Sequence, residues 1–303
     1  MDKVIYDQLI FFTCIRTVNQ RNGAHILINS IREFGGELKQ CPIWLFGADP
    51  KNVPCDSLES DGVQVLPLSI PESIASYYYG DKVYACTRAE ELASPAVHSL
   101  VWVSPENLII QPPLLFDLAG VYDAAVRPVH HINVGLQSTA PLDDFWKSVY
   151  QAVGVSDVHY MVDSFIEAYR MRAYFNSAAF ALNPSAKLSR RWFKCFEILV
   201  NDPGFQAGAC RDESYQVFLH QAVLSSLIAV ELDPDRIRIL PPDYIYPYNL
   251  QQDVPVDRQV QTLNDLVCIY FGGHSLNPDD MDDIVVEEPL SSWLANRVGD
   301  ISG

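Results

Sequence analysis

Apolar and polar residues follow one another along the chain in blocks that have the lengths of strands and helices. Short, almost continuously apolar runs predict strands at 7–16, 42–46, 63–68, 97–103, 122–129, 174–182, 236–240 and 266–271. Apolar residues at helical spacing predict helices at 24–34, 81–93, 145–153, 185–199 and 212–230, the first ending at a pair of glycines. Strands that alternate with helices from the start of the chain predict an α/β fold, with a mainly parallel twisted sheet and helices on both faces.

One strand of this pattern is followed by an abrupt polar corner. The run 97–103 is apolar, Ser104-Pro105-Glu106-Asn107 is not, and 108–110 is apolar again. A strand that is apolar throughout is typical of the middle of a sheet covered on both faces. Ligands of such sheets bind at the carboxyl ends of the strands, so we expect the corner to belong to a functional site.

The end of the chain has a different composition. From residue 277 onward acidic side chains dominate, namely Asp279, Asp280, Asp282, Asp283, Glu287 and Glu288. Such a segment is expected to be a solvated acidic face or a mobile end. We therefore predict a single α/β domain over 1–276 and an acidic tail over 277–303.

Charge and cysteine content narrow the classes of function. The 21 basic and 38 acidic residues give a net charge of −17, which disfavours nucleic acid and anionic membranes as partners. An anionic ligand then needs a local basic pocket or a divalent cation. Seven dispersed cysteines indicate reduced thiols and a cytoplasmic protein, and no apolar run approaches the ~20 residues of a membrane span.

Several stretches, in this order, resemble motifs of the nucleotide-sugar glycosyltransferases of the glycogenin and bacterial galactosyltransferase type, which have the A-type fold. The corner lies where that family has Asp-x-Asp between two apolar strands. YFNSAAFALNP (174–184) resembles the family's Asn-Ser/Ala-Gly strand, and Asp212-Glu213 resembles its Asp-Gln pair. ILPPDYIYPYNLQ (239–251) and VCIYFGG (267–273) resemble its Leu-Pro…Tyr-Asn turn and its closing strand, so the similarity extends over about residues 8–275.

The resemblance implies a set of site residues. Those expected at the reaction centre are Asn176, Asp212 and Glu213. Those expected to bind the donor are Thr13, Arg16, Lys82, Arg88, Ser104, Glu106, Asn107, Ser177, Tyr248 and Asn249. The partners implied are a nucleotide-sugar donor and an acceptor whose identity the motifs do not specify.

The metal position departs from the family pattern. In the family two aspartates and a late histidine hold a divalent cation against the diphosphate, whereas here Ser104 and Tyr270 occupy two of these three positions. Hydroxyl groups are poor ligands for hard cations compared with carboxylates. Glu106 and His274 remain as candidate ligands, and we expect Mn²⁺ or Mg²⁺ to bind weakly if at all.

Each candidate also has a purely structural interpretation. Glu106 is compatible with an ordinary turn, and Lys82 and Arg88 with a solvated helix face beside acidic residues. Asp212 and Glu213 are compatible with acids stabilised by a helix dipole. Asn176 in an apolar strand needs hydrogen-bond partners, which a ligand or the protein itself could supply. The cluster of Arg127, His130 and His131 is either a phosphate site or a surface histidine pair.

Two functions therefore remain open. One is a glycosyltransferase that uses a nucleotide sugar, and the other is a catalytically inactive relative that binds a nucleotide, a carbohydrate or a protein partner. Retention of Asn176, Asp212 and the Tyr248-Asn249 turn favours the enzyme, whereas loss of Asp-x-Asp and of the histidine favours the binding protein. A sugar nucleotidyltransferase is disfavoured because TCIRTVNQRNG (13–23) has only one glycine, and a dehydrogenase because Gly-x-Gly-x-x-Gly is absent.

Overall fold

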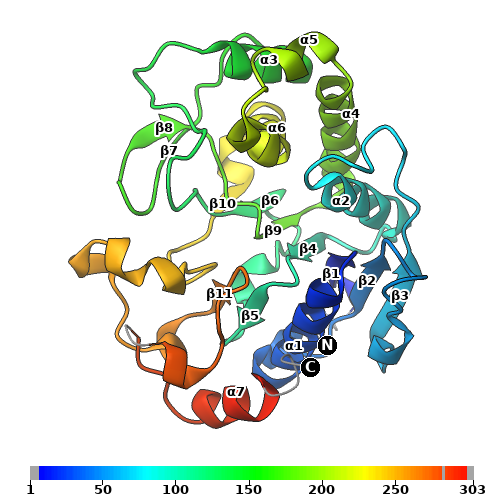
Figure 1. Ribbon diagram of the computed structural model, residues 1–303, viewed down its shortest axis with the longest axis vertical. Helices are drawn as coiled ribbons and strands as arrows, with labels where there is room; N and C mark the ends of the chain where they lie inside the picture. Colours follow the sequence, from blue (N-terminus) through cyan, green and yellow to red (C-terminus); the bar gives the residue numbers. More distant parts are fainter. Residues whose placement is uncertain (1–6, 282–283, 299–303) are drawn as a thin grey trace.

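A computed structural model describes residues 7–281 and 284–298, and it has a seven-stranded central sheet (Figure 1). The strands lie in the order β10 (Ile237–Ile239), β6 (Ala124–Val126), β9 (Ala179–Leu182), β4 (Ser99–Val103), β1 (Leu9–Ile15), β2 (Ile43–Gly47) and β3 (Val63–Pro67). All neighbours are parallel except β9, which is antiparallel to β4 and β6. The predicted α/β fold with a mainly parallel sheet is confirmed.

Helices cover both faces of this sheet. Phe11 and Ile15 of β1 belong to the apolar cluster that includes α1 (Val18–Phe34), whereas Phe12 and Cys14 point to the opposite face. The helices on that opposite face are α2 (Gly80–Leu92), α3 (Asp144–Val153), α4 (Leu188–Val200) and α6 (Glu213–Glu231), with the short α5 (Pro203–Ala207) beside them. The side-chain alternation of a strand thus divides the core into two layers.

Two element boundaries differ from the prediction for local chemical reasons. Helix α1 begins at Val18 instead of residue 24, because Thr17 and Gln20 form a capping box that stabilises the additional first turns of the helix. The strand expected over 174–182 is restricted to β9, because the Asn176 side chain accepts a hydrogen bond from the Ala178 N–H at 2.7 Å. That bond is a local alternative to sheet pairing.

The chain leaves the main sheet after the corner. There β5 (Asn107–Ile109) pairs antiparallel with β11 (Cys268–Tyr270), which brings a late segment of the chain beside the end of β4. A separate hairpin consists of β7 (Met161–Asp163) and β8 (Arg170–Arg172). Among the residues that the structure describes, no helix combines the length and the apolar character needed to cross a membrane.

The last helix, α7 (Leu290–Val298), packs against α1 (Figure 1). The ring centroids of Trp293 and Phe34 are 5.2 Å apart, and Leu290 and Leu294 are buried. Glu287 and Glu288 of the expected acidic tail are exposed, whereas Asp282, Asp283 and residues 299–303 lie outside the described residues. Leu290, Trp293 and Leu294 of the same segment are buried, because their spacing on α7 places them on the side of the helix that packs against the core.

Candidate functional site

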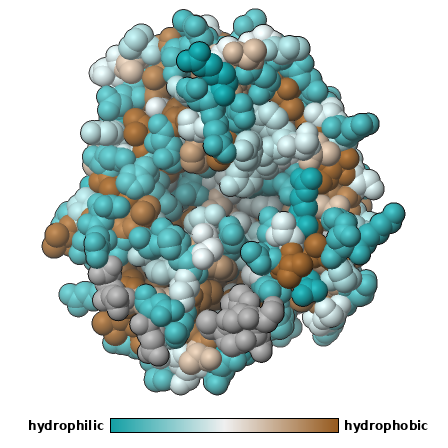
Figure 2. Space-filling view, viewed as in Figure 1, coloured by the Kyte–Doolittle hydropathy of each residue, from teal (hydrophilic) through white to brown (hydrophobic). Residues whose placement is uncertain are grey.

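A cavity lies at the carboxyl end of β4, on a face of the molecule that is largely hydrophilic and hollowed near its middle (Figure 2). Because β9 runs antiparallel to β4, with Ala179 opposite Val103, the residues just before β9 meet the residues just after β4. The cavity is therefore lined by the corner, by Asn176 and Ser177, and by side chains from α2, α6 and β11.

Backbone hydrogen bonds hold the corner against the entry to β9. The Ser104 N–H donates to the Ala178 carbonyl at 2.7 Å, and the Asn107 N–H donates to the Ser104 carbonyl at 3.0 Å. The buried Asn107 side chain donates to both of these carbonyls, at 3.1 and 3.2 Å. Asn107, expected to bind the donor, thus supports the corner from behind.

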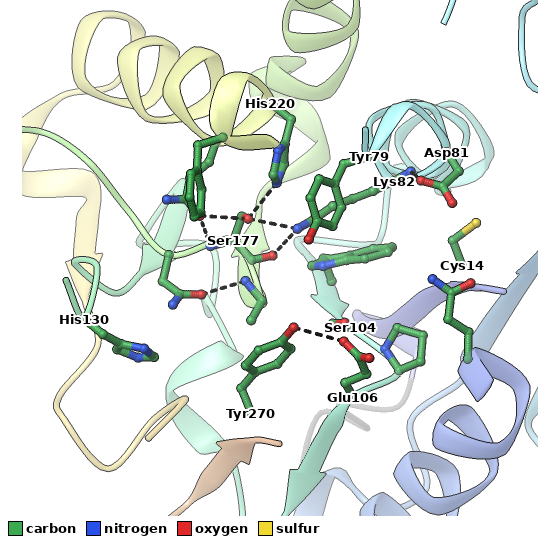
Figure 3. Close-up of a pocket in the computed structure, with 17 residues that line it drawn as sticks. Cys14, Tyr79, Asp81, Lys82, Ser104, Glu106, His130, Ser177, His220 and Tyr270 are labelled. Atoms are coloured by element: carbon green, nitrogen blue, oxygen red, sulfur yellow. Dashed lines mark hydrogen bonds between the residues drawn. The ribbon is translucent and has the colours of Figure 1, made fainter. Parts of the chain in front are cut away.

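Lys82 projects from α2 into the buried side of the cavity (Figure 3). Its ammonium donates to the Ser177 carbonyl and, at 2.9 Å, to the Ser177 hydroxyl. Burial lowers the pKa of Lys82 to about 7, because the free-energy cost of removing the charged form from water exceeds the electrostatic stabilisation by Cys86 and Asp81. The interpretation of Lys82 as part of a solvated helix face is excluded by its 5% exposure.

Ser177 is the centre of a hydrogen-bond network that joins α2 to α6. Its hydroxyl lies 2.9 Å from His220 Nε2 and 3.0 Å from Gln221 Oε1, and its N–H donates to the same Gln221 oxygen at 3.2 Å. With Lys82 as a third polar neighbour, the hydroxyl oxygen is surrounded. Ser177 is therefore placed to organise the site and not to act as a nucleophile, since an incoming carbon has no free approach.

The protonation of His220 follows from its surroundings. Nδ1 lies 2.9 Å from the Val217 carbonyl, which can only accept, so Nδ1 carries the proton and Nε2 can only accept. The single proton of the Ser177 hydroxyl is donated either to this Nε2 or to Gln221 Oε1. Burial, and then the nearby Lys82, hold the pKa of His220 well below its usual range. The ring is therefore neutral and stacks on Tyr79 with a centroid distance of 4.2 Å.

Glu106 and Tyr270 meet on the other side of the cavity (Figure 3). The Tyr270 hydroxyl donates to Glu106 Oε2 at 3.0 Å. Burial and the neighbouring Glu106 carboxylate both raise the pKa of Tyr270, so its hydroxyl stays protonated and remains a donor. This pair occupies two of the three positions that the family resemblance assigns to metal ligands.

The residues at this position do not fit a tightly held divalent cation. Within 7–281 and 284–298, no group of three or more histidine, cysteine, aspartate or glutamate side chains is arranged to hold a metal. His274 is exposed, lies 3.2 Å from the Asn249 amide, and does not line the cavity. Glu106 is thus left as one carboxylate with a tyrosine hydrogen bond, where hard cations need several oxygen ligands.

The structure brings five of the expected site residues into the cavity: Lys82, Ser104, Glu106, Asn176 and Ser177. Others lie elsewhere. Arg88 pairs with Glu91 on α2, Thr13 is buried within β1, Tyr248 bonds the Ser275 carbonyl, and Asn249 contacts His274. Arg16 lines a neighbouring depression at the ends of β1, β2 and β3, and its guanidinium donates to the Ala75 carbonyl at 2.9 Å.

Asp212 and Glu213 also lie outside the cavity lining, at the exposed start of α6. Glu213 accepts a hydrogen bond from the Tyr78 hydroxyl at 2.7 Å. Two turns further along α6, His220 and Gln221 occupy the cavity instead. Their signal in the sequence is a His-Gln pair between the apolar residues Leu219 and Ala222, in a helix that is expected to be mostly buried.

The structure separates the residues of the basic cluster after β6, with Arg127 and His130 in one environment and His131 in another. Arg127 is buried and His130 is partly buried, both lie within hydrogen-bond distance of the Ile245 carbonyl, and His130 lines the far edge of the cavity. Burial and the neighbouring arginine hold the pKa of His130 well below its usual range. His131 instead pairs with Glu167 at 2.8 Å, so the two histidines do not form a surface pair.

Comparison with known proteins places these features in a family context. The model of the Rhodobacterales glycosyltransferase domain matches residues 11–230. The galactosyltransferase LgtC, solved with donor and acceptor sugar analogues, aligns over 97% of this chain and 95% of its own with 12% identity and a TM-score of 0.53. An active-site mutant of LgtC gives 11% identity over the same shares and a TM-score of 0.54.

The bifunctional glycosyltransferase WbbM aligns over 98% of this chain and 53% of its own, with 11% identity and a TM-score of 0.50. No curated protein sequence matches the chain significantly. At identities this low, the structural similarities show the fold alone.

Proposed function

We propose, from the premise that this chain belongs to the Rhodobacterales glycosyltransferase domain family, that it transfers a sugar from a nucleotide-sugar donor to an acceptor hydroxyl. The observation that carries the proposal is that polar segments from distant parts of the sequence meet in one cavity. The corner after β4, the Asn176–Ser177 segment and the polar pair on α6 come from distant parts of the sequence and line one cavity at the strand ends.

The transferring sugar is proposed to lie between Asn176 and Lys82. Asn176 Oδ1 is occupied by the Ala178 N–H, and its Nδ2 has no partner within the described part of the chain, so it is available to a sugar hydroxyl. The Ser177 network fixes the position of Lys82 and of the α6 side chains beside it. Fixed polar groups of this kind lower the entropic cost of orienting the sugar for attack by an acceptor.

The nucleoside end of the donor is proposed to occupy the depression lined by Arg16. This depression lies at the ends of β1, β2 and β3 and shares the segment before α2 with the cavity, through Ala75 on one side and Tyr79 on the other. The position of Arg16 in this depression supports a role for it as a nucleotide ligand, as the family resemblance implies. No step is assigned to a metal, because the residues at the corner do not fit one.

A thermal-shift screen of nucleotide sugars, with and without manganese, tests the proposal. We expect at least one nucleotide sugar to raise the melting temperature, and the Asn176→Ala variant to lose that shift while it folds normally. Release of nucleoside diphosphate in the presence of sugar acceptors then tests transfer. Binding without release for any acceptor would indicate the inactive relative, and an absence of any shift would contradict a donor site.

A further inference from the structure

Tyr79 lies immediately before α2 in a backbone conformation that is unfavourable for a tyrosine. Its φ and ψ are 58° and 18°, in the left-handed region where a bulky side chain is rare. The other non-glycine residues with positive φ in the described part of the chain do not line the cavity; they are Ala119, Asn133, Ala168, Lys187 and Ile245. Tyr79 does line it, so this strained residue belongs to the site.

A tight turn fixes this conformation of Tyr79. The Gly80 N–H donates to the Tyr77 carbonyl at 3.1 Å, and a Cβ at Gly80 would lie 2.2 Å from the Ile74 carbonyl oxygen. A glycine at position 79 would adopt the left-handed conformation without a steric cost. The turn alone therefore does not explain a tyrosine here, and backbone strain of this kind is typical of functional sites.

One face of the Tyr79 ring is covered and the other is open. The ring stacks on His220 with a centroid distance of 4.2 Å, and the Lys82 ammonium lies 5.3 Å from its centroid (Figure 3). Both of these groups are 2.9 Å from the Ser177 hydroxyl oxygen, so they lie too close to each other to be on opposite faces of the ring. The other face accounts for the 43% exposure of Tyr79, and within the described residues no second aromatic ring packs on it.

The open face and its surroundings have the chemistry of a sugar-binding surface. The face of an aromatic ring is electron-rich, and it attracts the electron-poor C–H groups on the flat face of a pyranose. The hydroxyl groups at the edge of a pyranose need hydrogen-bond partners. Polar atoms of the cavity lining that have no partner among the described residues are the Tyr79 hydroxyl, Asn176 Nδ2 and Glu106 Oε1.

We propose that Tyr79 is the stacking platform for the acceptor, and that the acceptor is a pyranose sugar. The transferring sugar is placed beside Lys82, which lies on the covered side of the Tyr79 ring, so the open face is left for the second substrate. The inference rests on the proposed function, because it names the class of acceptor and a residue that binds it in the same cavity. Nucleobases also stack on aromatic rings, and a nucleobase at Tyr79 is the alternative outcome of the test.

Nuclear magnetic resonance titration of the full chain with small ligands tests the platform directly. The pyranose probes are methyl β-D-glucopyranoside and methyl β-D-galactopyranoside, D-sorbitol is the polyol without a ring, and uridine and adenosine are the nucleosides. Each titration is done alone and with the nucleoside diphosphate of the nucleotide sugar that the thermal-shift screen selects. We expect at least one pyranoside to bind about tenfold more tightly than sorbitol, with saturation transfer from the protein strongest at the C–H groups of one ring face.

Substitutions at position 79 separate the contribution of the ring from that of its hydroxyl. Tyr79→Phe keeps the ring, so pyranoside binding should weaken by about threefold at most. Tyr79→Leu keeps an apolar side chain without an aromatic face, so binding should weaken by about tenfold. Tyr169→Leu is the matched control, because Tyr169 is 45% exposed and lies outside the cavity lining, and it should leave binding unchanged.

A glycine at position 79 separates the role of the side chain from the strain of the backbone. Tyr79→Gly should lose pyranoside binding as Tyr79→Leu does. It should nevertheless unfold at a higher urea concentration than Tyr79→Leu, because only glycine adopts the left-handed conformation without a steric cost. The same denaturation curves show that both variants fold.

Three results would overturn the proposal: no pyranoside binding more tightly than sorbitol, equal pyranoside binding in Tyr79→Leu, or a nucleoside that binds more tightly than either pyranoside and is lost in Tyr79→Leu. These failures differ from a failure of the proposed function. If nucleotide sugars raise the melting temperature and one of these three results is found, the platform is wrong and the glycosyltransferase proposal stands. If a pyranoside binds through Tyr79 and no nucleotide sugar binds, the platform stands and the glycosyltransferase proposal fails.

Discussion

At the scale of single residues, the site consists of buried polar groups that form hydrogen bonds with one another instead of with water. Ser177 offers one hydroxyl, one carbonyl and one N–H, and all three are used by Lys82, His220 and Gln221. A buried network that is satisfied in this way is rigid, and removal of one member leaves the others without partners. Lys82 remains the one costly member, because its charge is not balanced within the network.

The first prediction concerns the stability of the free protein as a function of pH. The pKa of Lys82 is about 7 in the folded chain and roughly 10.4 in an unfolded one, so between these values the unfolded chain binds more protons. The free energy of unfolding contributed by Lys82 therefore rises with pH across this window, and the penalty of burying the charge is full below pH 7. The stability of Lys82→Met relative to the wild type should therefore be highest at pH 6 and fall progressively toward pH 10, while the loss of the hydrogen bonds to Ser177 adds a cost that does not depend on pH.

Urea denaturation of the wild type and of Lys82→Met at pH 6 and pH 9 measures this difference. Lys194→Met, at an exposed position on α4, is the matched control and should show no pH-dependent gain. A stability difference for Lys82→Met that is equal at both pH values would show that Lys82 does not titrate between them.

A second prediction concerns the metal. Glu106 is a single carboxylate that accepts a hydrogen bond from Tyr270, and one carboxylate with water ligands holds a divalent cation weakly. Calorimetry of the free protein with manganese should therefore reveal no tight binding, and manganese should at most modestly strengthen nucleotide binding. Micromolar manganese affinity that is lost in Glu106→Gln would contradict this interpretation of the corner.

At the scale of elements, two sets of contacts hold the sides of the cavity in place. Three consecutive tyrosines before α2 attach their segment to the opposite side: Tyr77 to Gln206, Tyr78 to Glu213, and Tyr79 to the ring of His220. On the other side, α1 packs directly on the corner, and a Cβ at Gly23 would lie 2.6 Å from the Pro105 carbonyl oxygen. The positions of the corner and of the tyrosine segment thus depend on these neighbouring helices.

The third prediction tests the contact between α1 and the corner. Gly23→Ala should raise helix propensity by up to about 1 kcal/mol, but the clash with the Pro105 carbonyl should cost about 1–3 kcal/mol. We expect a net loss of stability together with weaker nucleotide-sugar binding, measured by denaturation and thermal shift. Asn19→Ala, at an exposed position of the same helix, should not weaken binding. A Gly23→Ala variant more stable than the wild type would show that the corner can shift away from the added methyl group at little cost in free energy.

At the scale of the whole molecule, segments that are distant in sequence pack together in the core, and the C-terminal helix α7 is one of them. The cluster that contains Trp293 and Leu294 of α7 also includes Ile26 of α1 and Leu108 of β5, so the last described helix contributes to the core behind the corner.

The fourth prediction concerns this C-terminal helix. Trp293 is 7% exposed and packs on Phe34, so Trp293→Ala should lower the free energy of unfolding by about 3–5 kcal/mol. Ile198→Ala, at a residue that is 62% exposed on α4, should change it by less than about 0.5 kcal/mol. Equal stability of the two variants in chemical denaturation would mean that α7 does not contribute to the core.

The sequence alone determined those features that depend on neighbours along the chain. Apolar runs and helical spacing predicted the α/β fold, and the polar corner after 97–103 predicted the place of the site, because strand ends and turns are encoded locally. Lys82, Glu106, Asn176 and Ser177 were expected at the site because of the family resemblance, and all four line the cavity.

Only the tertiary structure decided which side chains meet. The antiparallel register of β9 brings Ser177 to the corner, and the length of α6 places His220 and Gln221, not Asp212 and Glu213, over the cavity. A helix shows the same local pattern at its first turn and at its third, so the sequence does not indicate which turn faces a ligand. The burial that leaves Lys82 unpaired likewise arises only when α2, β4 and α6 close around it, because desolvation is a property of the assembled core.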